Sequence, residues 1–300
     1  MIKIVEVGPR DGLQNEKVIL STDVKLEFIK KLSEAGLKTI EVTSFVKPSS
    51  IPQMADAIDL YSKVDIALAG KGINLPCLVP NLKGYETAKS LNVKEIALFS
   101  ATSNTFSQKN VNATVDETFE RMKEVAEQAK ADGIKVRGYV STAFGCPYEG
   151  IMDLKKLSSV VDRFFKLGVY ECSIGDTIGV ATPKQVREYF RSLKKEFEIA
   201  KLAGHFHDTR GRATANILVS LEEGITTFDS SAGGLGGCPY AKGATGNVAT
   251  EDAWYLIQSQ GLETGIDIAK LAEASKYILD QVHRSTESKF LKAFLNTGKV

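Results

Sequence analysis

The chain has 300 residues, of which 43% are hydrophobic and 25% are charged, as in an ordinary globular protein. Its 38 basic and 37 acidic residues give a net charge of +1, so the composition indicates no general surface for nucleic acid or membranes. The four cysteines show no CxxC spacing, and we expect reduced thiols instead of a disulfide framework.

No targeting or membrane-spanning segment is recognised in the sequence. The first residues, MIKIVEV, are typical of a β-strand and not of a signal peptide. No apolar run approaches the roughly 20 residues that a membrane-spanning helix needs. We therefore expect a cytoplasmic protein that binds neither membranes nor nucleic acid.

Short apolar runs alternate along the chain with longer amphipathic stretches. In the first of these stretches, residues 23–36, Leu26, Ile29 and Leu32 recur at the spacing of a helix that buries one face. The stretch closes on Gly36 just before the next apolar run, and several later stretches also close on glycine, which is typical of a helix end. The predicted strands are 2–7, 38–43, 73–79, 94–99, 135–141, 169–174, 201–206 and 225–229, and further predicted helices are 82–91, 115–133, 154–168, 183–197 and 214–224.

The alternation of strands and helices predicts parallel βαβ units. Eight such units in about 230 residues is the number found in a TIM barrel, (β/α)8. We expect one domain over residues 1–300, with the barrel in about 1–248 and a C-terminal helical extension in about 249–300. A doubly wound open sheet is the alternative, but the first strand–helix turn, GPRDGLQN, lacks the G-x-G-x-x-G dinucleotide fingerprint.

The strongest candidate for a functional site is the pair His205 and His207, at the end of the predicted strand 201–206. Positions i and i+2 of a strand face the same side, so both rings can converge on one divalent metal ion. Asp208 follows directly and could orient one of the rings by a hydrogen bond. In the alternative, one histidine is hydrogen-bonded in the core and the other lies at the surface.

Further candidates follow the first two predicted strands, because the active site of a TIM barrel lies at the carboxyl ends of its strands. Asp11 offers a carboxylate as a third metal ligand beside two imidazoles, and the adjacent Arg10 would keep it ionised. Glu41 could hold the Arg10 guanidinium by two hydrogen bonds. The alternatives are a structural Arg–Asp pair in a tight turn and a salt bridge at the rim.

A glycine-rich segment, 233–246, follows the last predicted strand. So many glycines are suited to a lid that closes over a substrate, and Cys238 within the segment is then a candidate reactive thiol. Asn247 comes directly after it, and its amide oxygen could complete a metal site. A helix N-cap is the competing role for Asn247.

Eight motifs spread over nearly the whole chain resemble those of the 3-hydroxy-3-methylglutaryl-CoA lyase family, a group of TIM-barrel metal-dependent lyases. The last motif is long and specific, because related Claisen-type synthases share the Arg-Asp-Gly and His-x-His features but not its glycine-rich loop. The motifs are EVGPRDGLQNE (6–16), IEVTSFVKP (40–48), LVPNLKG (78–84), QKNVNAT (108–114), GCPYEG (145–150), GDTIG (175–179), HFHDTRG (205–211) and GGLGGCPYAKGATGNVATED (233–252).

The resemblance implies cleavage of 3-hydroxy-3-methylglutaryl-CoA to acetyl-CoA and acetoacetate with Mg²⁺ or Mn²⁺, a reaction of leucine catabolism and ketone body metabolism. It implies an acyl-CoA substrate, and we also expect a homodimer. The metal ligands of the family match Asp11, His205, His207 and Asn247, and Arg10 matches the substrate-binding arginine. Cys238 matches the catalytic cysteine, while Glu41 and Asp176 match supporting acidic residues, so the expected catalytic set is Cys238, Arg10, Asp11, Glu41 and His205.

Two positions differ from the animal-type pattern of this family. Phe206, between the two histidines, would point away from the metal on a strand, and Arg210 could alter contacts at the entrance to the site. A related acyl-CoA lyase, a condensing synthase of the same barrel group and a non-catalytic acyl-CoA binding protein are the alternative functions.

Overall fold

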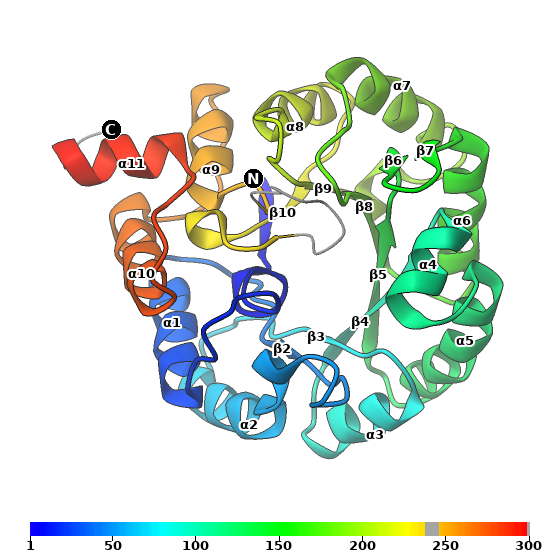
Figure 1. Cartoon of the computed structure of the whole chain (residues 1–300), viewed down its shortest axis with the longest axis horizontal. Coiled ribbons are helices and arrows are strands. Elements are labelled where there is room, and N and C mark those ends of the chain that lie inside the picture. The colour runs from blue at the N-terminus through cyan, green and yellow to red at the C-terminus, as the bar shows by residue number, and fades with distance from the viewer. Residues whose placement is uncertain (238–245, 299–300) are drawn as a thin grey trace.

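The computed structural model describes residues 1–237 and 246–298. Eight parallel strands form the centre of the molecule (Figure 1), and their positions agree with the eight predicted strands to within a few residues, except that the second and third are much shorter. They are β1 (Lys3–Glu6), β2 (Thr43–Ser44), β3 (Cys77–Leu78), β4 (Glu95–Ala101), β5 (Lys135–Ser141), β8 (Glu171–Asp176), β9 (Leu202–Phe206) and β10 (Thr227–Ser230).

The sheet closes on itself, which confirms the predicted TIM barrel and excludes the open sheet. Its hydrogen-bonded order is β1-β10-β9-β8-β5-β4-β3-β2. The two ends of this order meet in a parallel bridge between Glu6 and Ile40, where the Glu6 N–H donates to Thr39 O at 3.0 Å and the Glu41 N–H donates to Glu6 O at 2.9 Å. β2 and β3 are short as ladders, yet Ile40 and Asn74 continue the pairing beyond them.

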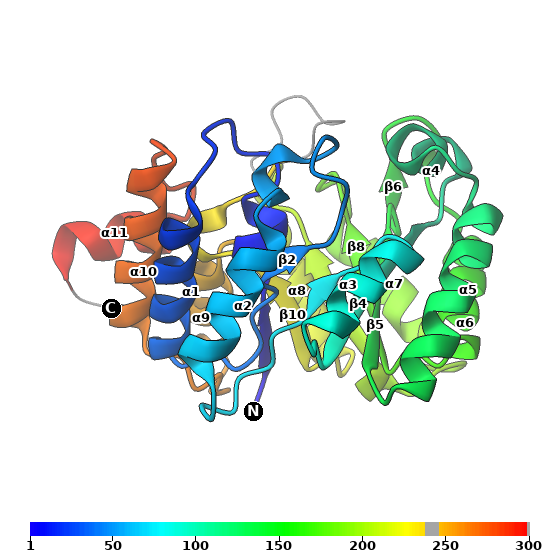
Figure 2. The same ribbon diagram turned by 90° about the horizontal axis from the view of Figure 1, so that it is seen from below.

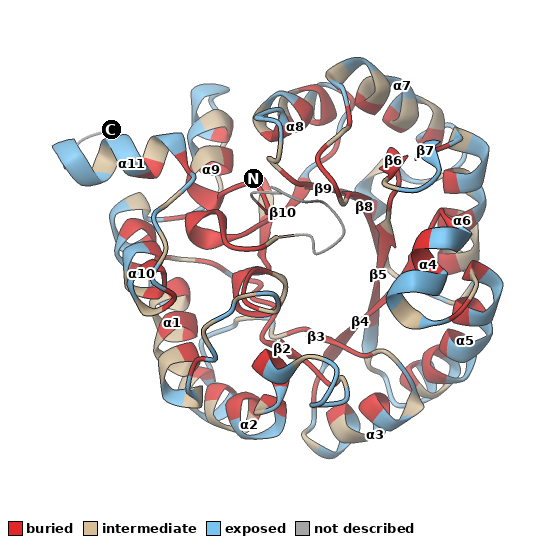
Figure 3. Ribbon diagram, viewed as in Figure 1, coloured by how far each residue is buried: buried red, intermediate tan, exposed pale blue. Residues whose placement is uncertain are grey.

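Helices surround the barrel and bury one face each against it. Figure 3 shows the strands and the inward faces of the helices as buried and the outer faces as exposed. Side-chain caps start several of the helices, such as Thr114, which forms a reciprocal capping box with Glu117. The helices of the ring are α1 (Thr22–Glu34), α2 (Ala57–Leu68), α3 (Leu82–Ser90), α5 (Val115–Ala131), α6 (Leu154–Lys166), α7 (Pro183–Leu193), α8 (Ala213–Glu222) and α9 (Thr250–Ser259).

Two additions lie at the end of the barrel opposite the N-terminus (Figure 2), where the strands have their carboxyl ends; we call this end the mouth. One is the short helix α4 (Asn104–Val111), and the other is an antiparallel hairpin of β6 (Gly145–Cys146) and β7 (Gly150–Ile151). Glu149 joins the two additions, because its carboxylate accepts hydrogen bonds from Ser103 Oγ at 2.6 Å and Thr105 N at 3.0 Å. The sequence patterns did not predict the hairpin.

The C-terminal part of the chain supplies the last helix of the ring and then two further helices outside it. α9 follows β10 and packs on α8, so it is the eighth helix of the barrel, although the sequence patterns placed the barrel end before it. α10 (Ile268–Gln281) packs between α1 and α9, and α11 (Lys289–Thr297) packs on α9 (Figure 1). Across residues 1–237 and 246–298, no helix has the length and apolarity needed to cross a membrane.

A candidate metal centre at the mouth of the barrel

A wide turn carries Arg10 and Asp11 from the end of β1 into the mouth. The turn η1 (Gly8–Gly12) is a π-helical turn, in which the Gly12 N–H donates to Val7 O at 3.1 Å. Such turns are frequent at functional sites. Glycine is required at its end, because a Cβ on Gly12 would lie 2.7 Å from Ser231 Oγ and 2.9 Å from Leu235 Cβ.

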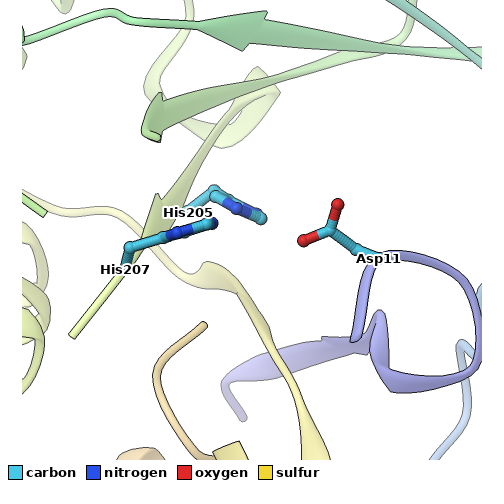
Figure 4. A group of neighbouring side chains, drawn as sticks. All are labelled: Asp11, His205 and His207. Atoms are coloured by element: carbon cyan, nitrogen blue, oxygen red, sulfur yellow. The ribbon is translucent and has the colours of Figure 1, made fainter. Parts of the chain in front are cut away.

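His205, His207 and Asp11 converge on one point. Figure 4 shows both imidazole rings turned toward the carboxylate of Asp11. One ligand atom from each of the three residues lies within 4.8 Å of the other two. The side chain of His205 is 13% exposed and His207 is 5% exposed, so neither histidine is a surface residue. The alternative, in which one of the two histidines lies at the surface, is thereby excluded.

Asn247 lies beside this cluster and is not a helix cap. It pairs with His207 in an antiparallel bridge, and its amide Nδ2 donates to Asp11 Oδ2 at 2.8 Å and to Leu235 O at 3.3 Å. The N-cap of α9 is Ala249, which excludes the competing role. The amide orientation leaves Asn247 Oδ1 without a partner among residues 1–237 and 246–298, so this atom could ligate a further group.

Two buried atoms of the cluster need such a group. Asn247 Oδ1 and His207 Nδ1 are buried and have no hydrogen-bond partner within the described parts of the chain. Unpaired buried polar atoms are costly unless a bound group satisfies them. A carboxylate oxygen, an amide oxygen and two imidazole nitrogens are donors that a divalent cation accepts. The residues present therefore fit a divalent metal ion.

The charges around the cluster keep Asp11 and His207 in metal-binding form, whereas at His205 the carboxylates of Asp229 and Asp11 outweigh burial and raise the pKa. Burial would raise the pKa of Asp11, but Arg10 together with the two histidines outweighs burial and holds that pKa below its usual value. Burial, assisted by His205, lowers the pKa of His207 to about 4. Near neutral pH, Asp11 is therefore ionised and His207 is neutral with a free lone pair.

Arg10 is buried between two carboxylates. Its Nη1 lies 2.6 Å from Asp11 Oδ1, and its Nη2 lies 2.8 Å from Glu41 Oε2. Tyr139 Oη donates to the same Glu41 oxygen at 3.1 Å, and the Tyr139 ring centroid lies 5.4 Å from the guanidinium carbon. Glu41 holds Arg10 through one oxygen, instead of the two hydrogen bonds that we expected. Its other oxygen, Oε1, has no partner among the described residues.

The other two aspartates of the candidate site hold backbone turns. Asp176 ends β8 and accepts from Val180 N at 2.9 Å and Ala181 N at 3.0 Å, while burial raises its pKa to about 6. Asp208 accepts from Ala213 N at 2.8 Å, at the start of α8. The hydrogen bonds of both carboxylates shape the loops that follow β8 and β9.

The carboxylate that does contact a histidine ring is Asp229, which the sequence patterns did not single out. Its Oδ2 lies 3.2 Å from His205 Nδ1. Asp229 is within β10 and pairs in register with His205 on β9. A charged residue inside an otherwise buried strand was the available signal, and Arg137 in β5 carries the same signal.

The two ends of the glycine-rich loop meet beside Asn247. A Cβ on Gly246 would lie 2.5 Å from the carbonyl carbon of Gly236, and a Cβ on Gly236 would lie 2.8 Å from Asn247 Nδ2. Both glycines have a positive φ, +127° at Gly236 and +103° at Gly246. At Gly236 and Gly246, any larger residue would therefore clash with its neighbours and strain the backbone. Residues 238–245 of the predicted lid, including Cys238, lie outside the described residues.

Fold and site together define a TIM barrel with a candidate site for a divalent metal at the carboxyl ends of its strands. The family model described as HMGL-like matches residues 1–278, and the chain belongs to this family. Both the family and the fold expected from the motifs are thereby confirmed.

Named relatives cover almost the whole chain. The mitochondrial hydroxymethylglutaryl-CoA lyase of Rattus norvegicus is 49% identical over 97% of this chain and 89% of its own length. A crystal structure of hydroxymethylglutaryl-CoA lyase from Pseudomonas aeruginosa has a TM-score of 0.95 at 45% identity, over 98% of this chain and 97% of that chain. The structure of an HMG-CoA lyase from Acinetobacter baumannii in complex with coenzyme A and 3-methylmalate has a TM-score of 0.93 at 35% identity, over 100% of this chain and 97% of that chain.

Proposed function

We propose that this enzyme cleaves 3-hydroxy-3-methylglutaryl-CoA to acetyl-CoA and acetoacetate, as a hydroxymethylglutaryl-CoA lyase. The observation that carries the proposal is the convergence of Asp11, His205 and His207 beside the buried Arg10, at the mouth of a barrel. Relatives of that name over nearly the full length support it, and a relative solved with coenzyme A supports an acyl-CoA substrate.

The reaction makes three chemical demands. The proton of the tertiary hydroxyl must leave, the enolate that forms at the thioester must be stabilised, and that carbanion must be protonated. Bound Mg²⁺ or Mn²⁺ would lower the pKa of the alcohol and orient the substrate. The residues that would hold the ion are Asp11, His205, His207 and Asn247.

Arg10 meets the second demand. Its guanidinium is fixed by Glu41 and Asp11 before any substrate binds, so it can stabilise charge on the thioester oxygen without first reorganising. Glu41 in turn is held by Tyr139. Asp176 and Asp208 support the site through the turns that follow β8 and β9.

We assign the third step, protonation of the enolate, to Cys238. Cys238→Ala should lower turnover by roughly 10²–10⁴, the usual worth of a general acid, and should leave metal binding intact. Cys238→Ser should recover little, because a hydroxyl is a much weaker acid than a thiol. A nearly fully active serine variant would instead favour a packing role.

The other cysteines make a thiol-labelling test selective. Cys77, Cys146 and Cys172 are buried and free, so a thiol reagent should label Cys238 first in the folded enzyme. Bound substrate should slow this labelling if the loop closes over the site. Substrate protection that mapped to Cys146 would contradict the assignment.

One assay separates the candidate functions. Purified protein is stripped of metal, given 3-hydroxy-3-methylglutaryl-CoA and Mg²⁺ or Mn²⁺, and monitored for acetoacetate, with His207→Ala as the control. Metal-dependent release of acetoacetate is the expected result. A condensing synthase would instead consume acetyl-CoA with a keto acid, and a binding protein would retain the thioester unchanged.

We also propose a cellular location, a metabolic role and an oligomeric state. We place the enzyme in the cytoplasm, in leucine catabolism and ketone body metabolism, acting without nucleic acid or membrane. We further propose a homodimer, which light scattering would report as about twice the chain mass of 32.6 kDa. A single-chain mass at micromolar concentration would contradict the dimer.

A further inference from the structure

Asp229 lies at the centre of a buried hydrogen-bond network below the metal site. Its Oδ1 accepts from Arg137 Nη2 at 2.8 Å, and its Oδ2 accepts from Ser173 Oγ at 2.6 Å. The same Oδ2 lies 3.2 Å from His205 Nδ1. Asp229 is 1% exposed and Arg137 is fully buried, so no solvent competes for these contacts.

Arg137 is anchored at its other side, which fixes the orientation of the Asp229 carboxylate. Its Nε donates to Glu171 Oε1 at 2.7 Å, and its guanidinium carbon lies 5.0 Å from the Tyr139 ring centroid. A guanidinium can only donate, so the Asp229 oxygen that faces it must accept. Glu171 and Asp229 therefore both bind Arg137, but only Asp229 also contacts a histidine.

The donors and acceptors of this network specify one tautomer of His205. An ionised carboxylate only accepts, so the ring nitrogen that faces Asp229 must carry the proton. In a neutral imidazole, the other nitrogen then has the lone pair. The competing carboxylate is Asp11, whose oxygens already accept from Arg10 at 2.6 Å, Gln14 at 3.1 Å and Asn247 at 2.8 Å. Three of the roughly four acceptor positions of Asp11 are thereby used, so Asp229 is the better acceptor for the His205 proton.

We propose that Asp229, oriented by Arg137, is a positioning residue that fixes His205 as its Nδ1–H tautomer and presents Nε2 to the metal. This inference rests on the metal site of the proposed function and names a residue on which that site depends. A carboxylate that holds a ligating histidine in this way typically contributes 10–100-fold to metal affinity.

The first test needs no substitution in the network. Long-range ¹H–¹⁵N spectra of metal-free protein labelled with ¹⁵N-histidine, in mildly alkaline buffer, distinguish protonated from unprotonated ring nitrogens. The His205 signals are assigned by their absence from a His205→Gln variant, and the chain has only two other histidines. We expect a protonated Nδ1 and an unprotonated Nε2. A protonated Nε2 on wild-type His205 would overturn the proposal.

The second test is Asp229→Asn. Arg137 still donates, so the asparagine oxygen must face the guanidinium and its NH₂ must face His205 Nδ1. The amide then donates where the carboxylate accepted, which moves the ring proton to Nε2. We expect Mn²⁺ to bind 10–100-fold more weakly, measured by calorimetry, and the His205 spectrum to change to the Nε2–H tautomer.

Glu171→Gln is the matched control, because it disturbs the other carboxylate that binds Arg137, and Glu171 does not contact His205. It should leave Mn²⁺ affinity and the tautomer as in the wild type. Asp229→Asn binding Mn²⁺ within about threefold of wild type, or Glu171→Gln losing as much affinity as Asp229→Asn, would overturn the proposal. Neither test uses substrate, so a failed lyase assay leaves both readouts interpretable. If Asp229→Asn does not fold, the wild-type spectrum decides alone.

Discussion

Arg10 combines a buried position with contacts to two carboxylates that have different tasks. Asp11 is shared with the candidate metal cluster, whereas Glu41 is held by Tyr139. A buried guanidinium is tolerated only where its charge is paired. Its Nε has no partner among the described residues, so the Nε–H is an unused donor while each terminal nitrogen contacts a carboxylate.

Arg10→Lys should lower kcat by about 10²–10³ while KM changes much less. Lysine keeps the charge but loses the planar fork that reaches Asp11 and Glu41 together. Steady-state kinetics with 3-hydroxy-3-methylglutaryl-CoA measure this. A kcat within about threefold of wild type would favour a purely structural salt bridge.

At this scale the sequence predicts residues that stand at strand ends and misses those inside strands. His205, His207 and Asp11 could be proposed because the barrel rule places strand ends together, and Asn247 because it follows the glycine-rich segment. Asp229 could not, since its role depends on the register between β9 and β10, which puts it beside His205. One residue of slippage would turn Asp229 to the opposite face, and no pattern in either strand specifies that register.

Among the elements, the base of the glycine-rich loop offers a direct test. Gly236→Ala should weaken Mn²⁺ binding by about 10-fold or more, because the new methyl would lie 2.8 Å from Asn247 Nδ2 and displace that side chain. Gly261→Ala is the control, since its φ is also positive, +70°, but it has no neighbour within 4 Å.

The control should cost about 1–2 kcal/mol of stability from backbone strain and leave Mn²⁺ affinity unchanged. Calorimetric titration and thermal melting of both variants provide the two readouts. Equal Mn²⁺ affinities in the two alanine variants would contradict the role assigned to the loop base.

A second feature at the level of elements is a pair of buried carboxyls that join η1, α9 and the start of the glycine-rich segment. Glu6 accepts from Gly8 N at 2.8 Å and from Thr250 Oγ1 at 2.7 Å, and Glu251 accepts from Gly233 N at 3.0 Å. Burial raises the pKa of Glu6 to about 7 and, with a contribution from Glu6, that of Glu251 to about 8.

Glu251→Gln should therefore stabilise the protein at pH 8 but not near pH 4.5. The folded state keeps the Glu251 proton up to about pH 8, whereas the unfolded chain loses it near pH 4.5, so wild-type stability falls across that window. Glutamine does not titrate. The difference in melting temperature between the two proteins should grow from pH 5 to pH 8, and a constant difference would contradict a raised pKa.

Element types were predictable where periodicity is strong, and irregular elements were not. β5 was predicted with its observed bounds, because 135–141 is a continuous strand pattern. In the π-helical turn η1, a Cβ on Gly12 would clash with Ser231 and Leu235, which lie more than 200 residues away in the chain. The hairpin of β6 and β7 is too short to show an alternating pattern.

For the whole molecule, a bound metal should raise thermal stability, because it binds only where the folded barrel brings its ligands together. Mn²⁺ at about 100 times its dissociation constant should add about 2.7 kcal/mol to the free energy of unfolding. That corresponds to a melting temperature higher by roughly 5 °C. Scanning calorimetry with and without Mn²⁺ measures the shift. His207→Ala should lose most of it, and an equal shift in wild type and variant would contradict the assigned ligand.

Asp11 and Asn247 are hydrogen-bonded although 236 positions separate them along the chain. On the ribosome, the residue at one end of that contact is synthesised long before the other, at about 5–20 residues per second. The nascent chain therefore carries an incomplete set of the proposed cation ligands for most of its synthesis. Loop closure over such a distance is slow compared with local helix formation, so the cation site should be among the last parts of the native structure to appear. Metal uptake can then serve as a kinetic marker for the end of folding.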